Sequence, residues 1–360
     1  MHIKLFYDGG GFIIMKIMPD NKKLLYSGRI DWSNPEEPVF TYPCTSVKIK
    51  YTGSFLRICV RNKSAYWDNY LGCIADGRHS SLLLPKDGTC SFDIPTGRTA
   101  DNVHTVMFFK RQDSCHEMSI LWFETSDDGE ILSLPEKPSR KIEVYGDSVS
   151  AGEVSEAVEY IGKEDPEHNG EYSNSWYSYA WITARRLDAQ IHDIAQGGAA
   201  LLDNTGWFNG PEYMGMESIW DKTRYNPVFG SPLEWDFSKY TPHVVIVAFG
   251  QNDSNPEDYM KKDYNGDKAV KWRKHYKDFL AGLREKYPEA YIICCTTMLE
   301  HDISWDNAIE EVVNLSGDSR ISHYMFRRNG CGTPGHIRIQ EAEEMASEMC
   351  NYIESLGIGW

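Results

Sequence analysis

The chain has 360 residues, which is long for one compact domain and enough for two domains that each bury a core. Apolar residues make up 41% of the chain, so the composition is that of a globular protein and not of a disordered or fibrous one. The formal net charge of −16, with basic residues scattered along the chain, argues against nucleic acid or an anionic membrane surface as a partner.

The cysteines and the N-terminus bear on the cellular compartment. The nine cysteines show no metal-type spacing, which favours free thiols in a reducing compartment. The apolar stretch around residues 12–15 is short, is interrupted by Lys16 and lacks a small-residue cleavage site, so no signal peptide is predicted. No apolar run reaches the roughly 18 residues of a membrane-spanning helix. We therefore expect a cytoplasmic protein, unless a leader has been lost.

Residues 26 to about 123 consist of short runs in which apolar and polar side chains alternate, separated by clusters of Gly, Pro, Asn and Asp. Residues 46–51, 56–60 and 104–109 are such runs. This pattern predicts an all-β sandwich. A polar stretch with prolines at residues 125–138 predicts a boundary. We place the two domains at residues 1–135 and 136–360.

After residue 141 the pattern changes to alternating strands and helices. Strands are predicted at residues 142–146, 190–195, 244–250, 291–296 and 321–326, and helices at 175–187, 270–286, 307–315 and 338–356. Such alternation predicts a parallel sheet with helices on both faces. Ligands of these sheets bind at the carboxyl ends of the strands, so the residues that follow each strand are the candidates for chemistry.

Three successive strand ends carry residues that suit acyl transfer. Ser148 follows the first strand, where its hydroxyl becomes a nucleophile if a histidine reaches it, although a serine there could equally cap a helix. Gly197 follows the second strand with an unobstructed N–H, and Asn252 follows the third with a side-chain amide. Both can donate to a substrate oxygen, although glycine and asparagine are also ordinary turn residues. A nucleophile and two donors at three strand ends are hard to explain as unrelated turns.

A candidate base lies in Thr333-Pro334-Gly335-His336, immediately before the last predicted helix. Because a single histidine among eleven is usually a surface or a core residue, its position rather than its type singles out His336.

These segments resemble known families. Gly146-Asp147-Ser148, Gly197, Gly250-Gln251-Asn252-Asp253 and His336 resemble the four blocks of the SGNH hydrolase superfamily. In the N-terminal half, Ser27-Gly28-Arg29-Ile30, His104-Thr105-Val106 and Lys110-Arg111 resemble the jelly-roll domain of carbohydrate esterase family 2, and residues 235–242 are similar to that family's pattern too. The resemblance extends from about Tyr26 over nearly the whole chain. It implies a jelly-roll sandwich followed by a three-layer, flavodoxin-like α/β domain.

The resemblance also implies roles for the candidates. Ser148 would attack an ester carbonyl, and His336 would take the serine proton and return it to the departing sugar hydroxyl. The Ser148 N–H, the Gly197 N–H and the Asn252 side chain would hold the oxyanion, with Gly198 in place of Gly197 if the register is shifted by one. It implies no metal and no other cofactor. The substrate implied is acetylated xylan or a related hemicellulose oligosaccharide, from which O-acetyl groups would be removed.

One departure concerns the third member of the triad. Most SGNH enzymes carry Asp three residues before the histidine, and Thr333 occupies that position here. We expect a Ser-His dyad whose histidine is oriented by a backbone carbonyl, as in some family 2 members. Asp302 and Asp306 are alternative partners.

Aromatic residues are the candidates for sugar contacts. By the resemblance, Trp305 is the expected sugar platform, and Trp207, Phe208, Tyr213 and Trp220 also fall in segments that should surround the site, where they could equally be packing.

Other functions remain open at this point. A non-catalytic carbohydrate-binding protein with a degenerate hydrolase domain would explain the missing Asp, and an SGNH esterase acting on a non-carbohydrate ester shares the same fold. A zinc-dependent deacetylase is disfavoured because the sequence shows no His-x-x-x-His or Asp/His ligand cluster. The acetyl position, the sugar backbone and the oligomeric state are not predicted.

Overall fold

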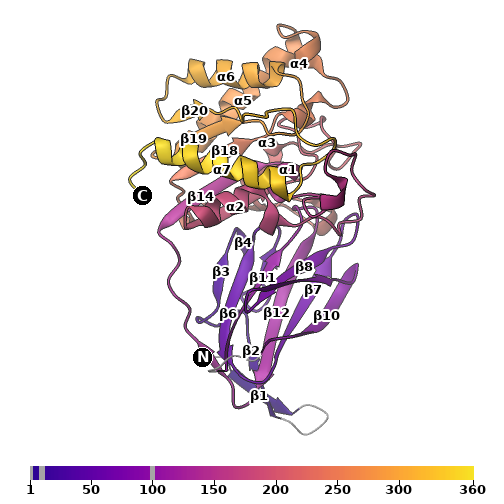
Figure 1. The fold of residues 1–360 in the computed structure, drawn as a ribbon, viewed down its shortest axis with the longest axis vertical. Coiled ribbons are helices and arrows are strands. Elements are labelled where there is room, and N and C mark those ends of the chain that lie inside the picture. The colour runs from indigo at the N-terminus through magenta and orange to yellow at the C-terminus, as the bar shows by residue number, and fades with distance from the viewer. Residues whose placement is uncertain (1–2, 8–12, 98–101) are drawn as a thin grey trace.

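The structure is a computed structural model that describes residues 3–7, 13–97 and 102–360. A pair of antiparallel sheets forms the lower part of the molecule in Figure 1, and a parallel sheet with helices forms the upper part. The predicted jelly-roll sandwich and α/β domain are therefore confirmed. No helix among the described residues has the length and apolar character needed to cross a membrane.

The sandwich is made of two antiparallel sheets. The first runs β1 (Ile3–Tyr7), β2 (Ile13–Ile17), β12 (Glu117–Ser126), β5 (Val39–Phe40) and β4 (Ile30–Asp31), with β7 (Leu56–Lys63) beside β12 and β10 (Asp87–Ile94) beside β7. The second runs β13 (Glu130–Leu132), β6 (Ser46–Thr52), β11 (Val103–Lys110), β8 (Tyr70–Ala75) and β9 (Arg78–Leu83), with β3 (Leu25–Ser27) beside β6.

The two-residue period of the strands builds the core of the sandwich. In β6, Val47, Ile49 and Tyr51 are buried while Lys48 between them is exposed. Side chains at alternate positions of a strand point to the same face, so the three apolar residues meet the facing sheet. There they join a cluster that includes Val60 of β7.

The predicted boundary region is partly strand. β12 continues to Ser126, and β13 pairs with β6 after a short turn at residues 127–129, so the longer stretch outside helices and strands is residues 133–139. This stretch runs along the side of the sandwich up to β14 (Arg140–Gly146), and the predicted division after residue 135 falls within it (Figure 1). At the other end, Phe12 of the predicted apolar stretch lies outside the described residues, and the residues after it form β2.

The second domain contains a five-stranded parallel sheet. Its order is β15 (Ala189–Ala195), β14, β18 (Val244–Ala248), β19 (Tyr291–Cys295) and β20 (Ile321–His323). All five predicted strands are present. The third, fourth and fifth end earlier than predicted, at Ala248, Cys295 and His323.

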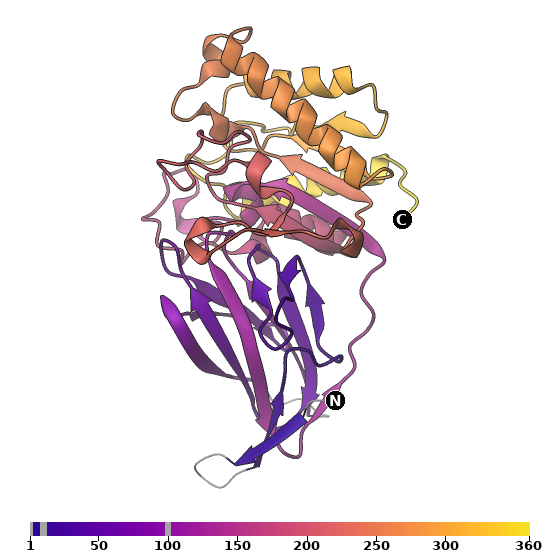
Figure 2. The same cartoon turned by 180° about the vertical axis from the view of Figure 1, so that it is seen from behind.

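Four longer helices cover the two faces of this sheet. α2 (Tyr179–Arg186) and α7 (Ile339–Ser355) lie on the face turned to the viewer in Figure 1, and α5 (Asp267–Lys286), on the other face with α6 (Ser304–Ser316), comes to the front in Figure 2. Successive strand residues serve opposite layers: Cys294 packs with α5 and α6, and Cys295 packs with α2 and α7. The three-layer arrangement is the predicted one.

Short elements occupy the loops around the sheet. The helices are α1 (Ser148–Ala151), α3 (Met216–Ile219) and α4 (Tyr259–Lys262), the 3₁₀ helices are η1 (Val158–Tyr160), η2 (Ser175–Tyr177), η3 (Pro227–Phe229), η4 (Phe237–Lys239) and η5 (Gln251–Ser254), and β16 (Lys222–Arg224) pairs with β17 (Leu233–Glu234).

A buried arginine joins the two domains. Arg29, on the turn between β3 and β4, has no exposed side-chain surface. Its guanidinium donates to Tyr145 Oη at 2.7 Å, to Glu143 Oε1 at 3.2 Å and to the carbonyls of Trp220 and Lys222. The sandwich is thereby fixed against the parallel sheet.

Candidate active site

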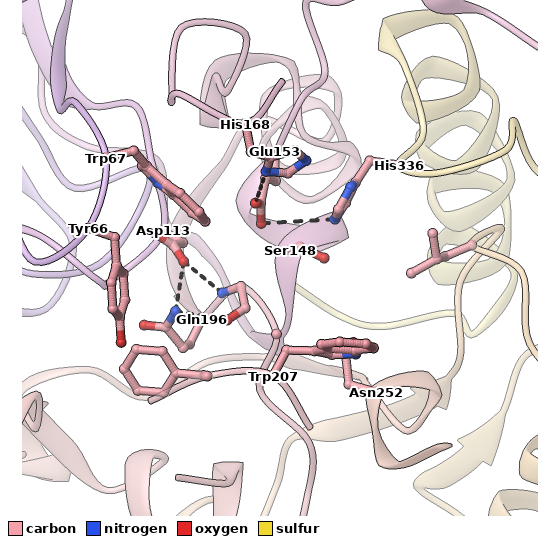
Figure 3. A pocket seen from close by; sticks show the side chains of 14 residues that line it. Tyr66, Trp67, Asp113, Ser148, Glu153, His168, Gln196, Trp207, Asn252 and His336 are labelled. Atoms are coloured by element: carbon pink, nitrogen blue, oxygen red, sulfur yellow. Dashed lines mark hydrogen bonds and ion pairs between the residues drawn. The ribbon is translucent and has the colours of Figure 1, made fainter. Parts of the chain in front are cut away.

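A cavity of about 520 Å³ lies where loops of both domains meet (Figure 3). Its walls include Ser148, Gly197, Asn252 and His336. The first three come together because β14, β15 and β18 end level with one another, with Gly146 paired to Ala195 on one side and to Ala248 on the other. Four residues predicted from separate segments therefore share one site.

Ser148 is the first residue of α1, directly after β14. The residue that caps this helix is Asp147, whose carboxylate accepts the N–H of Val149 at 3.0 Å. The alternative that Ser148 serves as the cap is therefore wrong. A side chain at Gly146 would collide with Ser150, since its Cβ would lie 2.1 Å from the serine oxygen. The tight turn thus presents Ser148 to the cavity.

Asn252 lies on η5 and is tied to the nucleophile turn. Its Nδ2 donates to Asp147 Oδ2 at 3.1 Å and to the Ala199 carbonyl at 3.2 Å. The Gln251 side chain donates to the same Asp147 oxygen, and burial raises the pKa of Asp147 to about 7. Both Asn252 hydrogens have partners, so Asn252 reaches a substrate oxygen only by sharing or exchanging one of these bonds.

Gly197 is paired with a residue that sequence reasoning missed. Asp113, on the sandwich turn between β11 and β12, accepts the Gly197 N–H at 2.9 Å and the Gln196 side chain at 2.7 Å. Burial, and next the negative charge of Glu153, raise the pKa of Asp113. One predicted oxyanion donor therefore contacts a carboxyl group of the other domain. No signal in the local sequence links Asp113 to this strand end.

His336 is oriented by a carboxylate. Its Nδ1 lies 2.7 Å from Asp165 Oδ2, and its backbone N–H donates to Asp165 Oδ1 at 3.0 Å. The prediction that a backbone carbonyl orients His336 is therefore wrong. Asp165 comes from the loop between β14 and β15, so the position three residues before His336 does not reveal it.

Neither alternative partner of His336 fills that role. Asp302 forms an ion pair with Lys261, and Asp306 lies 3.0 Å from His301 Nε2. Both aspartates are occupied elsewhere.

A second carboxylate and a second histidine complete the surroundings of the imidazole. Glu153 Oε2 lies 4.0 Å from His336 Nε2, and its Oε1 lies 3.0 Å from His168 Nδ1. His168 Nε2 in turn lies 3.3 Å from Asp165 Oδ2. Figure 3 shows Glu153 between the two imidazoles.

These contacts shift the charge states of the group. Burial lowers the pKa of His336, but Asp165 and Glu153 outweigh burial and the net pKa is raised. The hydrogen bonds to Asp165 and Glu153 raise the pKa of His168 to about 10. Burial would raise the pKa of Asp165, but its bonds to the two histidines hold that pKa below its usual range. The arrangement provides a polarised histidine in the same cavity as the buried Ser148 hydroxyl.

Comparison with known proteins identifies relatives of this chain. The carbohydrate esterase 2 N-terminal family model matches residues 26–135. Cellulase/esterase CelE of Acetivibrio thermocellus is 29% identical over 351 residues, which cover 95% of this chain and 40% of that protein. The chain is related to the family 2 carbohydrate esterases. It spans only 40% of the length of that relative.

A second curated relative and a solved structure also match the chain. An acetylxylan esterase / glucomannan deacetylase of Cellvibrio japonicus is 26% identical over 270 residues, 74% of this chain and 69% of that protein. The structure of a family two carbohydrate esterase from Clostridium thermocellum in complex with cellohexaose is 26% identical, with a TM-score of 0.77, and covers 93% of this chain and 99% of that one. The predicted resemblance to family 2 is thus confirmed over both domains.

The prediction that Trp305 is the sugar platform, which followed from the family 2 resemblance, is wrong. Trp305 is fully buried on α6, where its ring packs against Tyr259 and Trp272 and its indole N–H donates to Asp258. A ring that stacks on a sugar must expose one face, and Trp305 exposes none. Trp207, by contrast, is 66% exposed and lies in the cavity wall.

Three more aromatic side chains line the cavity together with Trp207. They are Tyr66 and Trp67 from the sandwich loop between β7 and β8, and Phe208 beside Trp207.

Three side chains of the types that bind metal ions also lie together here, although no Asp/His ligand cluster was expected from the sequence. Asp165, His168 and His336 each offer one ligand atom, and these atoms lie within 4.8 Å of one another. The spacing Asp165-x-x-His168 was the available signal, but His336 lies far along the chain.

Proposed function

We propose that the chain is a carbohydrate acetylesterase that removes O-acetyl groups from acetylated xylan or related hemicellulose oligosaccharides. The observation that carries the proposal is the presence of Ser148 and His336 in one cavity, with a carboxylate at Nδ1 of the histidine. The similarity to an acetylxylan esterase / glucomannan deacetylase and to an esterase solved with cellohexaose supports a carbohydrate ester as substrate.

In the proposed reaction, Ser148 Oγ attacks the acetyl carbonyl carbon while His336 Nε2 takes the serine proton. The oxyanion is held by the Ser148 N–H, the N–H of Gly197 or Gly198, and the Asn252 amide. Collapse of the tetrahedral intermediate breaks the bond to the sugar oxygen, which takes the proton from His336. Water, activated by His336, then releases acetate from Ser148.

Asp165 supports this mechanism as a positioning residue. A carboxylate at Nδ1 fixes the tautomer in which Nε2 accepts a proton, and it stabilises the imidazolium that forms. It acts on the reaction through His336 alone.

The competing proposal of a non-catalytic binding protein loses its best support. That proposal rested on the absence of an acidic triad member, and Asp165 occupies the corresponding place beside His336. Trp207 remains available as a sugar-stacking ring in either case, because its face is open at the cavity wall.

The location of the reaction is also proposed. All nine cysteines are unpaired, which favours a reducing compartment, so we propose that the protein acts in the cytoplasm on imported oligosaccharides. Recovery of the native protein from the culture medium would contradict this location.

The test compares the wild type with Ser148→Ala and His336→Ala, each purified in EDTA. We expect release of p-nitrophenol from the acetate ester, less from longer acyl esters, and release of acetate from acetylated xylo-oligosaccharides, all abolished in both variants. Wild-type rates no higher than those of the variants would overturn the proposal and favour the binding protein.

A further inference from the structure

Beside the proposed nucleophile, three side chains converge that the esterase mechanism uses only in part. His168 takes no part in the proposed proton transfers, yet its Nε2 lies 3.3 Å from the Asp165 oxygen that also faces His336 Nδ1. The ligand atoms of Asp165, His168 and His336 all lie within 4.8 Å of one another. Imidazole nitrogens and carboxylate oxygens form the ligand sets that Zn²⁺ and similar dications prefer.

Two of these side chains, His168 and Asp165, have a second partner that leaves the ligand atom directed at the others. His168 directs its Nδ1 to Glu153 at 3.0 Å, which leaves Nε2 for the cluster. Asp165 Oδ1 is held by Arg338 at 2.9 Å, which leaves Oδ2. A histidine whose other ring nitrogen meets a carboxylate is the usual arrangement in metal sites, where such partners orient the ligands.

Charge and access also suit a cation. Asp165 and Glu153 place two carboxylates around the imidazoles, and once His168 has given up its proton to make room for the ion, Arg338 offsets only part of this charge. The side chains of Asp165, His168 and His336 are 18%, 28% and 19% exposed, so an ion can reach them from the cavity.

We propose that Asp165, His168 and His336 bind one transition-metal dication of the Zn²⁺ type, and that its occupancy inhibits the esterase. The ion replaces two protons, the one between Asp165 and His336 Nδ1 and the one that His168 Nε2 directs at Asp165. Both are released to solvent, and water fills the remaining coordination position. The positive charge then disfavours uptake of the Ser148 proton at Nε2. The binding claim is independent of the proposed function, and the inhibition claim rests on it.

Binding is tested on the full chain, stripped with EDTA and dialysed, by isothermal titration with Zn²⁺. We expect one site per chain in the wild type and affinity at least about tenfold weaker in His168→Ala and His168→Gln, with a similar loss in Glu153→Gln. Two variants are matched controls and should bind as the wild type does: His79→Ala, a histidine outside the cluster, and Cys331→Ser, which removes the exposed thiol. Circular dichroism shows whether each variant is folded. Two different substitutions are made at His168 so that one folded variant remains if the other fails to fold.

Inhibition is tested by p-nitrophenyl acetate hydrolysis with and without Zn²⁺, each variant being normalised to its own rate in EDTA. We expect reversible loss of wild-type activity at stoichiometric Zn²⁺, and resistance in both His168 variants. No stoichiometric binding, or equal binding by the His168 variants, overturns the site. Full activity of the zinc-loaded wild type overturns the inhibition. Inactivity of the wild type in EDTA refutes the esterase proposal and the inhibition claim, while the titration still decides the site.

Discussion

At the scale of single residues, Asp165 decides how His336 works. Burial alone would lower the pKa of His336, and the hydrogen bond to Asp165 is the largest effect that raises it. A base must be neutral to accept a proton, so a raised pKa moves the acid limb of the activity profile to higher pH. Removal of the carboxylate should move that limb to lower pH.

We therefore expect Asp165→Asn to lower kcat by about 10² to 10⁴-fold and to shift the acid limb of kcat/KM to lower pH. Both effects follow from the loss of the correct tautomer and of the charge beside Nδ1. The measurement is a pH profile of acetate ester hydrolysis. Asp302→Asn is the matched control, because Asp302 pairs with Lys261 and should leave the profile unchanged. An unshifted acid limb in Asp165→Asn would contradict the orienting role.

The two tryptophans Trp207 and Trp305 should respond in opposite ways to the same substitution. Trp207→Ala removes an exposed ring at the cavity, and we expect a higher KM for acetylated oligosaccharides with little change in KM for p-nitrophenyl acetate or in thermal stability. Trp305→Ala empties a core position and should cost about 3–5 kcal/mol of unfolding free energy. Steady-state kinetics on both substrates and urea unfolding separate the cases. Equal KM values for Trp207→Ala and the wild type on the sugar substrate would remove Trp207 as a platform.

Three of the four site residues found from the sequence are those that a strand end positions. Ser148, Gly197 and Asn252 follow strands of one sheet, so topology alone brings them together. Asp165 and Asp113 were missed because they reach the site from loops whose course no local pattern fixes. Trp305 could have been placed: residues 305, 308, 309 and 312 recur at helical spacing and form the buried stripe of α6.

At the scale of elements, the long periodic segments were predicted well and their ends less well. The helix predicted at 270–286 begins at Asp267, and that predicted at 307–315 begins at Ser304. The first turn of α5 is mostly polar and exposed, so the apolar period that reveals a helix starts later than the helix itself. The alternation in β6 and β11, in contrast, ran close to the full length of each strand.

The buried pair of Arg29 and Glu143 is the interdomain element with the clearest energetic consequence. Burial would raise the pKa of Glu143, but Arg29 and the neighbouring His192 and Tyr145 lower it to about 2. A carboxyl whose folded pKa lies below its usual 4.5 adds stability that is fully present above pH 4.5. That stability is lost as the pH falls from 4.5 toward 2.

We expect Arg29→Met to cost about 3–5 kcal/mol at pH 7, because it leaves a buried carboxylate without its cation. The difference from the wild type should shrink as the pH falls from 4.5 toward 2, where Glu143 takes up a proton. Urea unfolding at a series of pH values measures both. The double variant with Glu143→Gln should recover part of the loss, and a penalty for Arg29→Met that persists undiminished at low pH would refute this account.

At the scale of the whole molecule, the cavity belongs to both domains. Tyr66, Trp67 and Asp113 come from sandwich loops, whereas Ser148 and His336 come from the α/β domain. Each domain could be predicted from its own periodicity, but contacts between them depend on tertiary packing that no single segment encodes. The sandwich is therefore part of the site, and its residues can be tested as such.

Asp113 provides a direct test of whether the sandwich contributes to the active site. Its carboxylate accepts the Gly197 N–H, a proposed oxyanion donor, and its pKa is raised by burial and by Glu153. As the pH rises through that pKa, Asp113 gains a negative charge next to the place where the oxyanion forms. Like charges repel, so the ionised form should slow the reaction, and the wild-type rate should fall as the pH rises through the pKa of Asp113.

We expect Asp113→Asn, which keeps an acceptor oxygen but carries no charge, to remove this fall and raise kcat/KM above the pKa of Asp113 by roughly tenfold, equal to about 1.4 kcal/mol of barrier. Below the pKa of Asp113 the two proteins should differ little, since both then present a neutral group. The measurement is kcat/KM for acetate esters over the whole pH range in which both proteins stay folded, with Asp68→Asn on a nearby sandwich loop as the exposed control. A lower rate for Asp113→Asn at every pH would mean that the carboxylate supports the Gly197 turn and does not oppose the oxyanion.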